Sequence, residues 1–181
     1  MNPIIAQAMG FVAMGFNILS YQQKSAKRII AFQLFGGLFF CLNYLLLGAY
    51  IAAILNIIAF IRAILFLKKE KLHTDSIGWL VVFGAAYLSA YLLTFTVLGK
   101  APTPANFIIE CLPVIGMFAT HLAFRHNEAK TIRRLSLISS VSWLIFNIIN
   151  IAIGAILCEV FSFISIIIAM IRLDGLFSKK E

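Results

Sequence analysis

Long apolar runs are the feature of this sequence that most limits its fold. Seven of them fill most of the 181 residues, and each is about long enough for a helix to cross roughly 30 Å of hydrocarbon. The runs lack the alternating pattern of membrane β-strands and are too long for tilted strands. The sequence therefore predicts an all-α polytopic membrane protein with seven transmembrane helices, over residues 4–21, 29–47, 50–67, 77–98, 105–124, 135–150 and 153–173.

The composition supports a membrane location. Apolar side chains make up 62% of the chain and charged ones 12%, whereas soluble proteins average about 25% charged residues. A soluble protein of this size could not bury so much apolar surface. The loops are too short for a catalytic domain, and no span holds a nucleophile with a base at helical spacing or a metal-binding cluster. We therefore expect no enzyme, no cofactor and no metal site.

The Lys and Arg residues indicate the orientation. Thirteen of them lie at alternate ends of the runs, whereas the other side holds only Lys100. Because basic residues favour the cytoplasmic side, the sequence predicts a multi-pass inner-membrane protein with its N-terminus outside and its C-terminus in the cytoplasm. This placement also argues against a nucleic-acid partner as the reason for the net charge of +8. The short sixth run can begin at Ile132 if Arg133 and Arg134 reach to the lipid headgroups.

The sequence matches itself when it is shifted by about 103 positions. Helix ends, basic loops and the very short second and sixth loops coincide under this shift, which predicts two three-helix repeats. An odd number of helices per repeat requires one extra crossing to keep the repeats parallel, so we expect a three-plus-one-plus-three arrangement. The expected units are residues 1–69 as the first repeat, 70–104 as a linker with a single transmembrane helix over 77–98, and 105–181 as the second repeat with a short cytoplasmic tail.

Four polar residues lie at one depth inside the predicted spans. The shift pairs Gln7 with Glu110 and Asn56 with Glu159, and polar groups placed in a membrane at such cost are candidates for function. The alternative is that all four are structural hydrogen-bonding groups between helices. We expect Glu110 and Glu159 to lie close together, because they come from two helices of the same repeat. Two neighbouring carboxylates in a low-dielectric region make a proton a candidate coupling ion.

Three further residues inside the spans have two interpretations each. Arg62 is the only basic residue deep in a span, and it either pairs with a carboxylate or extends to the cytoplasmic side. Gly10 and Pro113 occupy matching positions in the first and fifth spans. Both residues weaken a helix and are candidate hinges, although both are also common in membrane helices.

The three-plus-one-plus-three arrangement resembles that of the SWEET sugar transporters and the wider PQ-loop superfamily. In that family the second helix of each repeat carries a Ser-x-x-x-Trp pattern that lines the pocket, and Ser139 and Trp143 fit it. Gly36 and Phe40 hold the equivalent places in the first repeat, and Asn56 fits a pocket asparagine of the third helix. The resemblance implies that these residues line a solute-binding pocket.

Two positions differ from the superfamily pattern. Glu159 stands where the second repeat should repeat the asparagine, and the Pro-Gln pair is replaced by Tyr21-Gln22-Gln23 and by Phe124-Arg125. A closer resemblance is to the bacterial inner-membrane proteins typified by YgjV. It covers nearly the whole chain and is clearest in LNYLLLGAYIAAILN and ECLPVIGMFAT. This resemblance implies a bacterial inner-membrane location and names no substrate.

Two functions are compatible with these features. The first is transport of a small polar or cationic solute by alternating access, with Phe40 and Trp143 as stacking walls beside the four polar residues. The second is a receptor or assembly factor that uses the same bundle without transport. The expected partners are membrane lipid and a small-molecule solute, with a homo-oligomer as a further candidate. A cavity that leads from one face to the polar residues favours transport, whereas a solidly packed bundle favours a scaffold.

Overall fold

The computed structural model describes residues 3–46, 50–150 and 153–175, and all regular elements in these residues are helices. The tail beyond residue 175, expected in the cytoplasm, lies outside the described residues. The helices are α1 (Pro3–Tyr21), α2 (Ala26–Leu46), α3 (Tyr50–Leu67), α4 (Lys69–Leu72), α5 (Ile77–Thr96), α6 (Pro104–Arg125), α7 (Ala129–Ile149) and α8 (Ile153–Asp174). The short helix α4 has no counterpart in the sequence-based prediction.

Within the described residues, six helices are long and apolar enough to cross a membrane. They are α1, α2 and α5 to α8, which correspond to six of the seven predicted spans. The remaining predicted span corresponds to α3, whose fully described part, Ala53–Leu67, is apolar but shorter. Crossing by α3 therefore stays a prediction.

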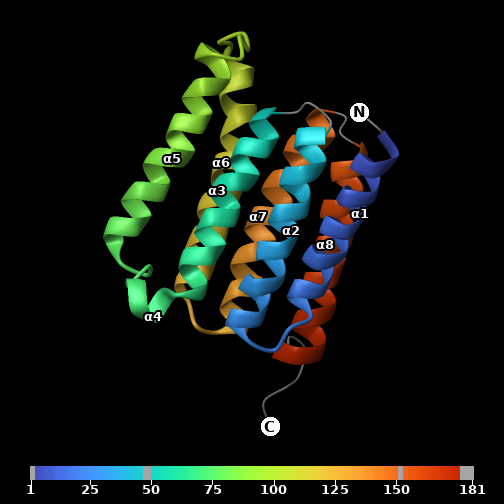
Figure 1. The fold of residues 1–181 in the computed structure, drawn as a ribbon, viewed down its shortest axis with the longest axis vertical. Helices are drawn as coiled ribbons and strands as arrows, with labels where there is room; N and C mark the ends of the chain where they lie inside the picture. The colour runs from blue at the N-terminus through green and yellow to red at the C-terminus, as the bar shows by residue number, and fades with distance from the viewer. Residues whose placement is uncertain (1–2, 47–49, 151–152, 176–181) are drawn as a thin grey trace.

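The helices pack as two groups of three. In one group α2 lies between α1 and α3, and in the other α7 lies between α6 and α8 (Figure 1). The groups meet where α3 packs on α6 and where α8 packs on α1, which we call the α3–α6 seam and the α8–α1 seam. Helices α2 and α7 also touch each other. Helix α5 stands outside these six, against α6 and α3.

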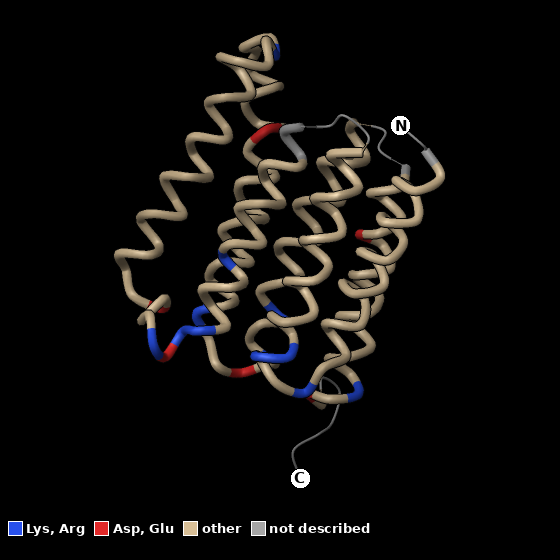
Figure 2. The backbone as a smooth tube through the Cα atoms, viewed as in Figure 1, with Lys and Arg blue, Asp and Glu red and all other residues tan. Residues whose placement is uncertain are grey.

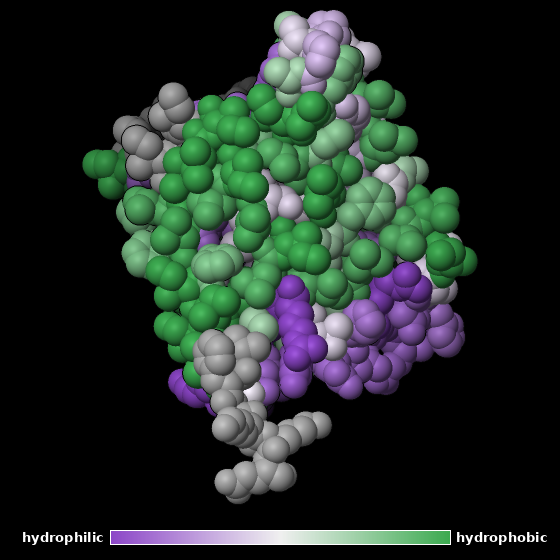
Figure 3. Space-filling view, turned by 180° about the vertical axis from the view of Figure 1, so that it is seen from behind, coloured by the Kyte–Doolittle hydropathy of each residue, from purple (hydrophilic) through white to green (hydrophobic). Residues whose placement is uncertain are grey.

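The two ends of the bundle differ in charge. Lys and Arg gather at the lower end in Figure 2, where α1, α3, α6 and α8 finish, and we call this the basic end. Lys100 lies at the opposite end, in the loop between α5 and α6. Between the ends the visible surface is mostly apolar, as the rear view in Figure 3 shows. An apolar belt between polar ends is what a lipid bilayer requires of a protein that crosses it.

Apolar clusters fill the basic end. The larger cluster joins α2, α3, α6 and α7, and the smaller one joins α1, α7 and α8. Close van der Waals packing of these side chains holds the two helix groups together there, because lipid supplies little hydrophobic driving force between helices. The buried members of the larger cluster are Ala26, Ile29, Ile30, Ala63, Phe66, Ala123, Phe124, Ala129 and Ile132.

Polar contacts also cross both seams at the basic end. Lys69, on α4, donates from Nζ to the main-chain oxygens of Phe124 and Arg125 at 3.2 and 2.9 Å, which caps the end of α6. Burial lowers the pKa of Lys69. At the other seam, Arg172 on α8 donates from Nη2 to Oε1 of Gln22, the residue that follows α1, over 2.9 Å. Each seam is therefore fastened by a basic side chain and an apolar cluster.

Helix α7 begins at Ala129, six residues before the predicted start at Leu135. Hydropathy alone places the start of this span directly after the basic pair Arg133 and Arg134. The structure instead buries Arg133, which is 2% exposed, in an ion pair with Asp174 at the end of α8. The expectation that Arg133 reaches to the headgroups is therefore wrong, whereas its neighbour Arg134 is exposed.

Candidate functional site

A cavity of about 910 Å³ occupies the half of the bundle away from the basic end. Side chains of α1, α2, α3, α5, α6, α7 and α8 all contribute to its lining. The lining includes exposed residues near the ends of three helices, Gln7, Leu98 and Gly154. The cavity is therefore open at that end, and its volume suits a small organic molecule.

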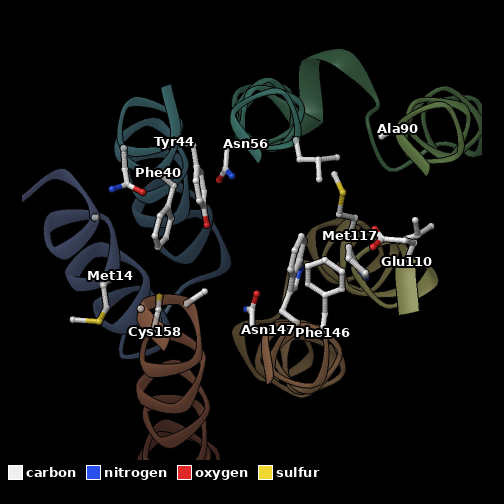
Figure 4. Close-up of a pocket in the computed structure, with 18 of the residues that line it drawn as sticks. Met14, Phe40, Tyr44, Asn56, Ala90, Glu110, Met117, Phe146, Asn147 and Cys158 are labelled. Carbon is white, nitrogen blue, oxygen red and sulfur yellow. The ribbon is translucent and has the colours of Figure 1, made fainter. Parts of the chain in front are cut away.

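The walls of this larger cavity are mainly aromatic and apolar. Phe40 and Tyr44 stack on α2 with ring centroids 6.1 Å apart, and Trp143 and Phe146 meet edge to face on α7 at 6.0 Å. Figure 4 shows Phe40 and Tyr44 of α2 across the cavity from Phe146 of α7. Such surfaces bind apolar or flat groups without fixing their orientation, which needs polar partners.

Glu110 forms an ion pair with Lys100 at the rim of the larger cavity. Helix α6 begins just before it, where Pro104 takes the first position and the Thr103 hydroxyl accepts from Asn106 N at 3.2 Å. The Glu110 side chain is 10% exposed and that of Lys100 is 29% exposed. The predicted carboxylate is thus neutralised by a loop lysine that the sequence reasoning did not place in the site.

A smaller chamber of about 130 Å³ lies next to the larger cavity, toward the basic end. Three predicted site residues, Phe40, Asn56 and Trp143, line both spaces. The chamber is polar where the larger cavity is apolar. The predicted residues Ser139 and Glu159 line it from α7 and α8, together with five polar residues that sequence reasoning missed: Asn17, Gln33, Thr120, Ser140 and Ser162.

Arg62 extends into this region and behaves differently from either expectation. It is 5% exposed, so it does not reach the cytoplasmic side, and it is in neither of the ion pairs found among the described residues. Its Nη1 donates to Tyr87 Oη at 2.9 Å and to Met117 O at 3.1 Å. Its guanidinium carbon lies 5.2 Å from the centre of the Phe124 ring. The cation is therefore buried among neutral partners.

Glu159 lies on the opposite helix group and accepts a hydrogen bond from Ser140 Oγ at 2.8 Å. The expectation that it neighbours Glu110 is wrong. Helix α7 separates α6 from α8, so Glu110 lines the larger cavity and Glu159 the smaller chamber. Equal depth along two helices does not bring side chains together when a third helix stands between them. The two carboxylates do not form one coupled site.

The glycines among the predicted residues serve packing. A side chain at Gly36 would meet Ala13 O and Asn17 Oδ1 at 3.4 Å, so this position lets α1 approach α2 closely and does not line either cavity. At the position equivalent to Gly36 in the second repeat unit of the sequence, Ser139 accepts a hydrogen bond from Thr120 Oγ1 at 2.9 Å.

The candidate hinges Gly10 and Pro113 do line the larger cavity, within helices that continue through them. Their role as hinges stays a prediction.

Comparison with known proteins identifies one family. The model of the Imp-YgjV family, whose description is bacterial inner membrane protein, matches residues 4–176. No curated protein and no solved structure matches the chain. The match covers almost all of the helices described above. The chain therefore belongs to the Imp-YgjV family of bacterial inner membrane proteins.

Proposed function

We propose that this protein transports a small polar solute across the inner membrane by alternating access. In this proposal α3 crosses the membrane together with α1, α2 and α5 to α8, and the basic end faces the cytoplasm, as the distribution of Lys and Arg favours. The arrangement is SWEET-like, with α1–α3 and α6–α8 as parallel repeats and α5 as the joining helix. The cavity described above is then open to the outside.

The repeat is supported by the residues that line the two spaces. Most of them form pairs separated by 103 positions, as expected if both spaces lie on an axis that relates the repeats. The pairs in the smaller chamber are Asn17/Thr120, Tyr21/Phe124, Gly37/Ser140, Phe40/Trp143, Asn56/Glu159 and Ala59/Ser162. In the larger cavity they include Gln7/Glu110, Gly10/Pro113, Met14/Met117, Asn43/Phe146 and Tyr44/Asn147.

The observation that carries the transport proposal is the contrast between the two ends. At the opposite end an open cavity leads to a polar chamber, and at the basic end two apolar clusters close the bundle. A transporter caught with its site open to one side has this form. A bundle that served only as a receptor or assembly factor would have no need of a polar chamber between its two halves.

The seams supply the moving parts. Each repeat is held together by extensive packing of its central helix, α2 or α7, on two neighbours, whereas the repeats touch along the two seams. Rocking of one repeat against the other would open the seams at the basic end and close the cavity at the opposite end. The contacts of Lys69 and Arg172 across the seams would then break in each cycle.

Natural cysteines allow a test that needs no known solute. Cys158 lines the larger cavity, whereas Cys41 and Cys111 do not and can be replaced by Ala. We expect a membrane-impermeant maleimide to label Cys158 from the outside in right-side-out vesicles and, more slowly, from the inside in inverted vesicles. Labelling from the outside alone would support the receptor alternative and contradict transport.

Cross-links give the matched control. In the background with Cys158 alone, Gln22→Cys with Ser165→Cys joins α1 to α8 across a seam, where Gln22 Nε2 and Ser165 Oγ are 2.8 Å apart. Phe16→Cys with Phe32→Cys joins α1 to α2 within one repeat, where the rings are 5.9 Å apart. Oxidation of the seam pair to a disulfide, which leaves the single Cys158 thiol free, should abolish labelling of Cys158 from the inside only. The pair within one repeat should abolish neither.

A further inference from the structure

We propose that the smaller chamber binds a small zwitterion, an amino carboxylate whose carboxylate contacts Arg62 and whose ammonium contacts Glu159. The inference rests on the proposed function, because it names the class of solute for the same site. It is carried by the presence of one charged group of each sign on the lining of a single polar chamber.

Arg62 is the anion-binding half of this site. The side chain lines the chamber and is 5% exposed, and its Nη1 donates to a hydroxyl and a main-chain oxygen, both of them neutral. Its Nε is buried and has no hydrogen-bond partner among the residues that the structure describes. A guanidinium offers five N–H donors in a planar fork that matches a carboxylate. A buried cation with an unused donor is therefore a site for the carboxylate that the protein does not itself supply.

Glu159 is the cation-binding half. It lines the chamber from α8, on the repeat opposite Arg62, and Ser140 Oγ donates to its Oε2. It belongs to neither of the ion pairs found in the described part of the chain. It is also the only acidic residue on the lining of the chamber, as Arg62 is the only basic one, within the part that the structure describes.

This balance of charge selects the class of ligand. A monocation that approaches Glu159 is repelled by Arg62, and a monoanion that approaches Arg62 is repelled by Glu159. Either would also bring a net charge into a region of low dielectric, which is costly. A zwitterion brings no net charge and is attracted by both groups. The charges of the chamber therefore favour a zwitterion over either singly charged analogue.

The size and surroundings of the chamber limit the ligand further. Its volume of about 130 Å³ is several times the roughly 30 Å³ of one water in the liquid, which leaves room for a molecule of few heavy atoms. Asn17, Gln33 and Ser139 add neutral hydrogen-bonding groups. Phe40 and Trp143 lie where the chamber meets the larger cavity, so an apolar substituent on the ligand could extend into that cavity.

The spacing of the two charges sets the length of the ligand. Arg62 lies six residues beyond Asn56 on α3, which is about 9 Å along the axis, and Asn56 is the counterpart of Glu159 in the repeat. Both side chains are long enough to shorten this gap. Glycine, β-alanine and 4-aminobutyrate present an ammonium and a carboxylate at increasing separation, and together they sample the lengths that the chamber could accept.

Binding to the purified full chain in detergent tests the proposal. Titration calorimetry would measure glycine, β-alanine and 4-aminobutyrate against propylamine and propionate, which each carry one of the two charges. We expect at least one zwitterion to bind at least tenfold more tightly than both singly charged probes. The proposal is overturned if no zwitterion binds or if a singly charged probe binds equally well.

Charge-removing variants provide a readout that a structural role would not give. Glu159→Gln should weaken binding of the best zwitterion at least tenfold and strengthen binding of propionate. Arg62→Met should also weaken binding of the zwitterion at least tenfold, and it should strengthen binding of propylamine. Glu70→Gln, an exposed change on α4, is the control. If both site variants lose all probes together while remaining folded, or if both bind the zwitterion as wild type does, the assignment is wrong.

The outcome separates the inference from the proposed function. Zwitterion binding without labelling of Cys158 from the inside would keep the inference and refute transport. Labelling from both sides without zwitterion binding would keep transport and refute the inference.

Discussion

The ion pair between Arg133 and Asp174 gives the sharpest test of how the basic end is held together. The two side chains are 3% and 5% exposed, and Arg133 Nε donates to Asp174 Oδ2 at 2.8 Å. Arg133 Nη1 also donates to Gln23 O at 2.8 Å, so one guanidinium joins α7, α8 and the end of α1. The perturbation is Asp174→Asn, which keeps the shape of the side chain and removes its charge.

The expected loss of stability follows from burial. Removal of one partner of a buried ion pair leaves an uncompensated charge and costs about 3–5 kcal/mol. Arg133 keeps its main-chain acceptors in this variant, so we expect the lower limit, about 3 kcal/mol. For a chain of this length each kcal/mol lowers Tm by about 2–4 °C. Asp174→Asn should therefore lower Tm by roughly 6–12 °C.

Thermal unfolding in detergent, followed by circular dichroism, measures this change. Arg134→Met is the matched control, because this neighbouring arginine is exposed and its loss should change stability by less than about 0.5 kcal/mol. The double variant Arg133→Met with Asp174→Leu should recover more than half of the loss, since apolar replacements of buried pairs are often neutral. A Tm for Asp174→Asn within about 2 °C of wild type would refute the reasoning.

Three more predictions concern packing, orientation and capping. Gly116→Ala should cost about 1–3 kcal/mol in unfolding assays, because its Cβ would lie 2.7 Å from the indole nitrogen of Trp143. Gly15→Ala should be neutral or stabilising, because its Cβ would meet no described atom of a neighbouring element within 4 Å. A reporter inserted beside Lys71 should report a cytoplasmic location, and one inserted within residues 101–103 should report a periplasmic location. The reverse result would contradict the orientation. Lys69→Met should lower the free energy of unfolding by about 1–2 kcal/mol, because two carbonyls at the end of α6 lose their donor.

Hydropathy predicts most of this fold because lipid imposes a simple rule on the chain. The predicted runs at residues 4–21, 50–67 and 153–173 agree with α1, α3 and α8 to within one residue at each end. The rule fails at α7, where the partner that neutralises Arg133 lies 41 residues later in the sequence. A window of neighbouring residues cannot contain that information.

The site residues that follow from the repeat could be predicted from the sequence, whereas a partner that comes from a loop could not. Phe40, Asn56 and Trp143, chosen by the 103-residue shift and by resemblance, line both spaces. The partner of Glu110 was missed because it comes from a loop. Gly99, with φ of 66°, turns the chain, and Lys100 N donates back to an oxygen of α5, so the lysine returns toward α6. Left-handed backbone at glycine makes such a turn without strain.

Arg62 connects the proposed ligand with the proposed movement. Its partners Tyr87 and Met117 belong to α5 and α6, and it stacks near Phe124, also on α6. The cation therefore helps to hold α3 against α6, which is one of the two seams. A ligand carboxylate that binds Arg62 as proposed, through the unused Nε, would draw the guanidinium away from those neutral partners. It would then weaken the seam in the liganded state, and a difference of this kind between two conformations is what a solute must supply to drive alternating access.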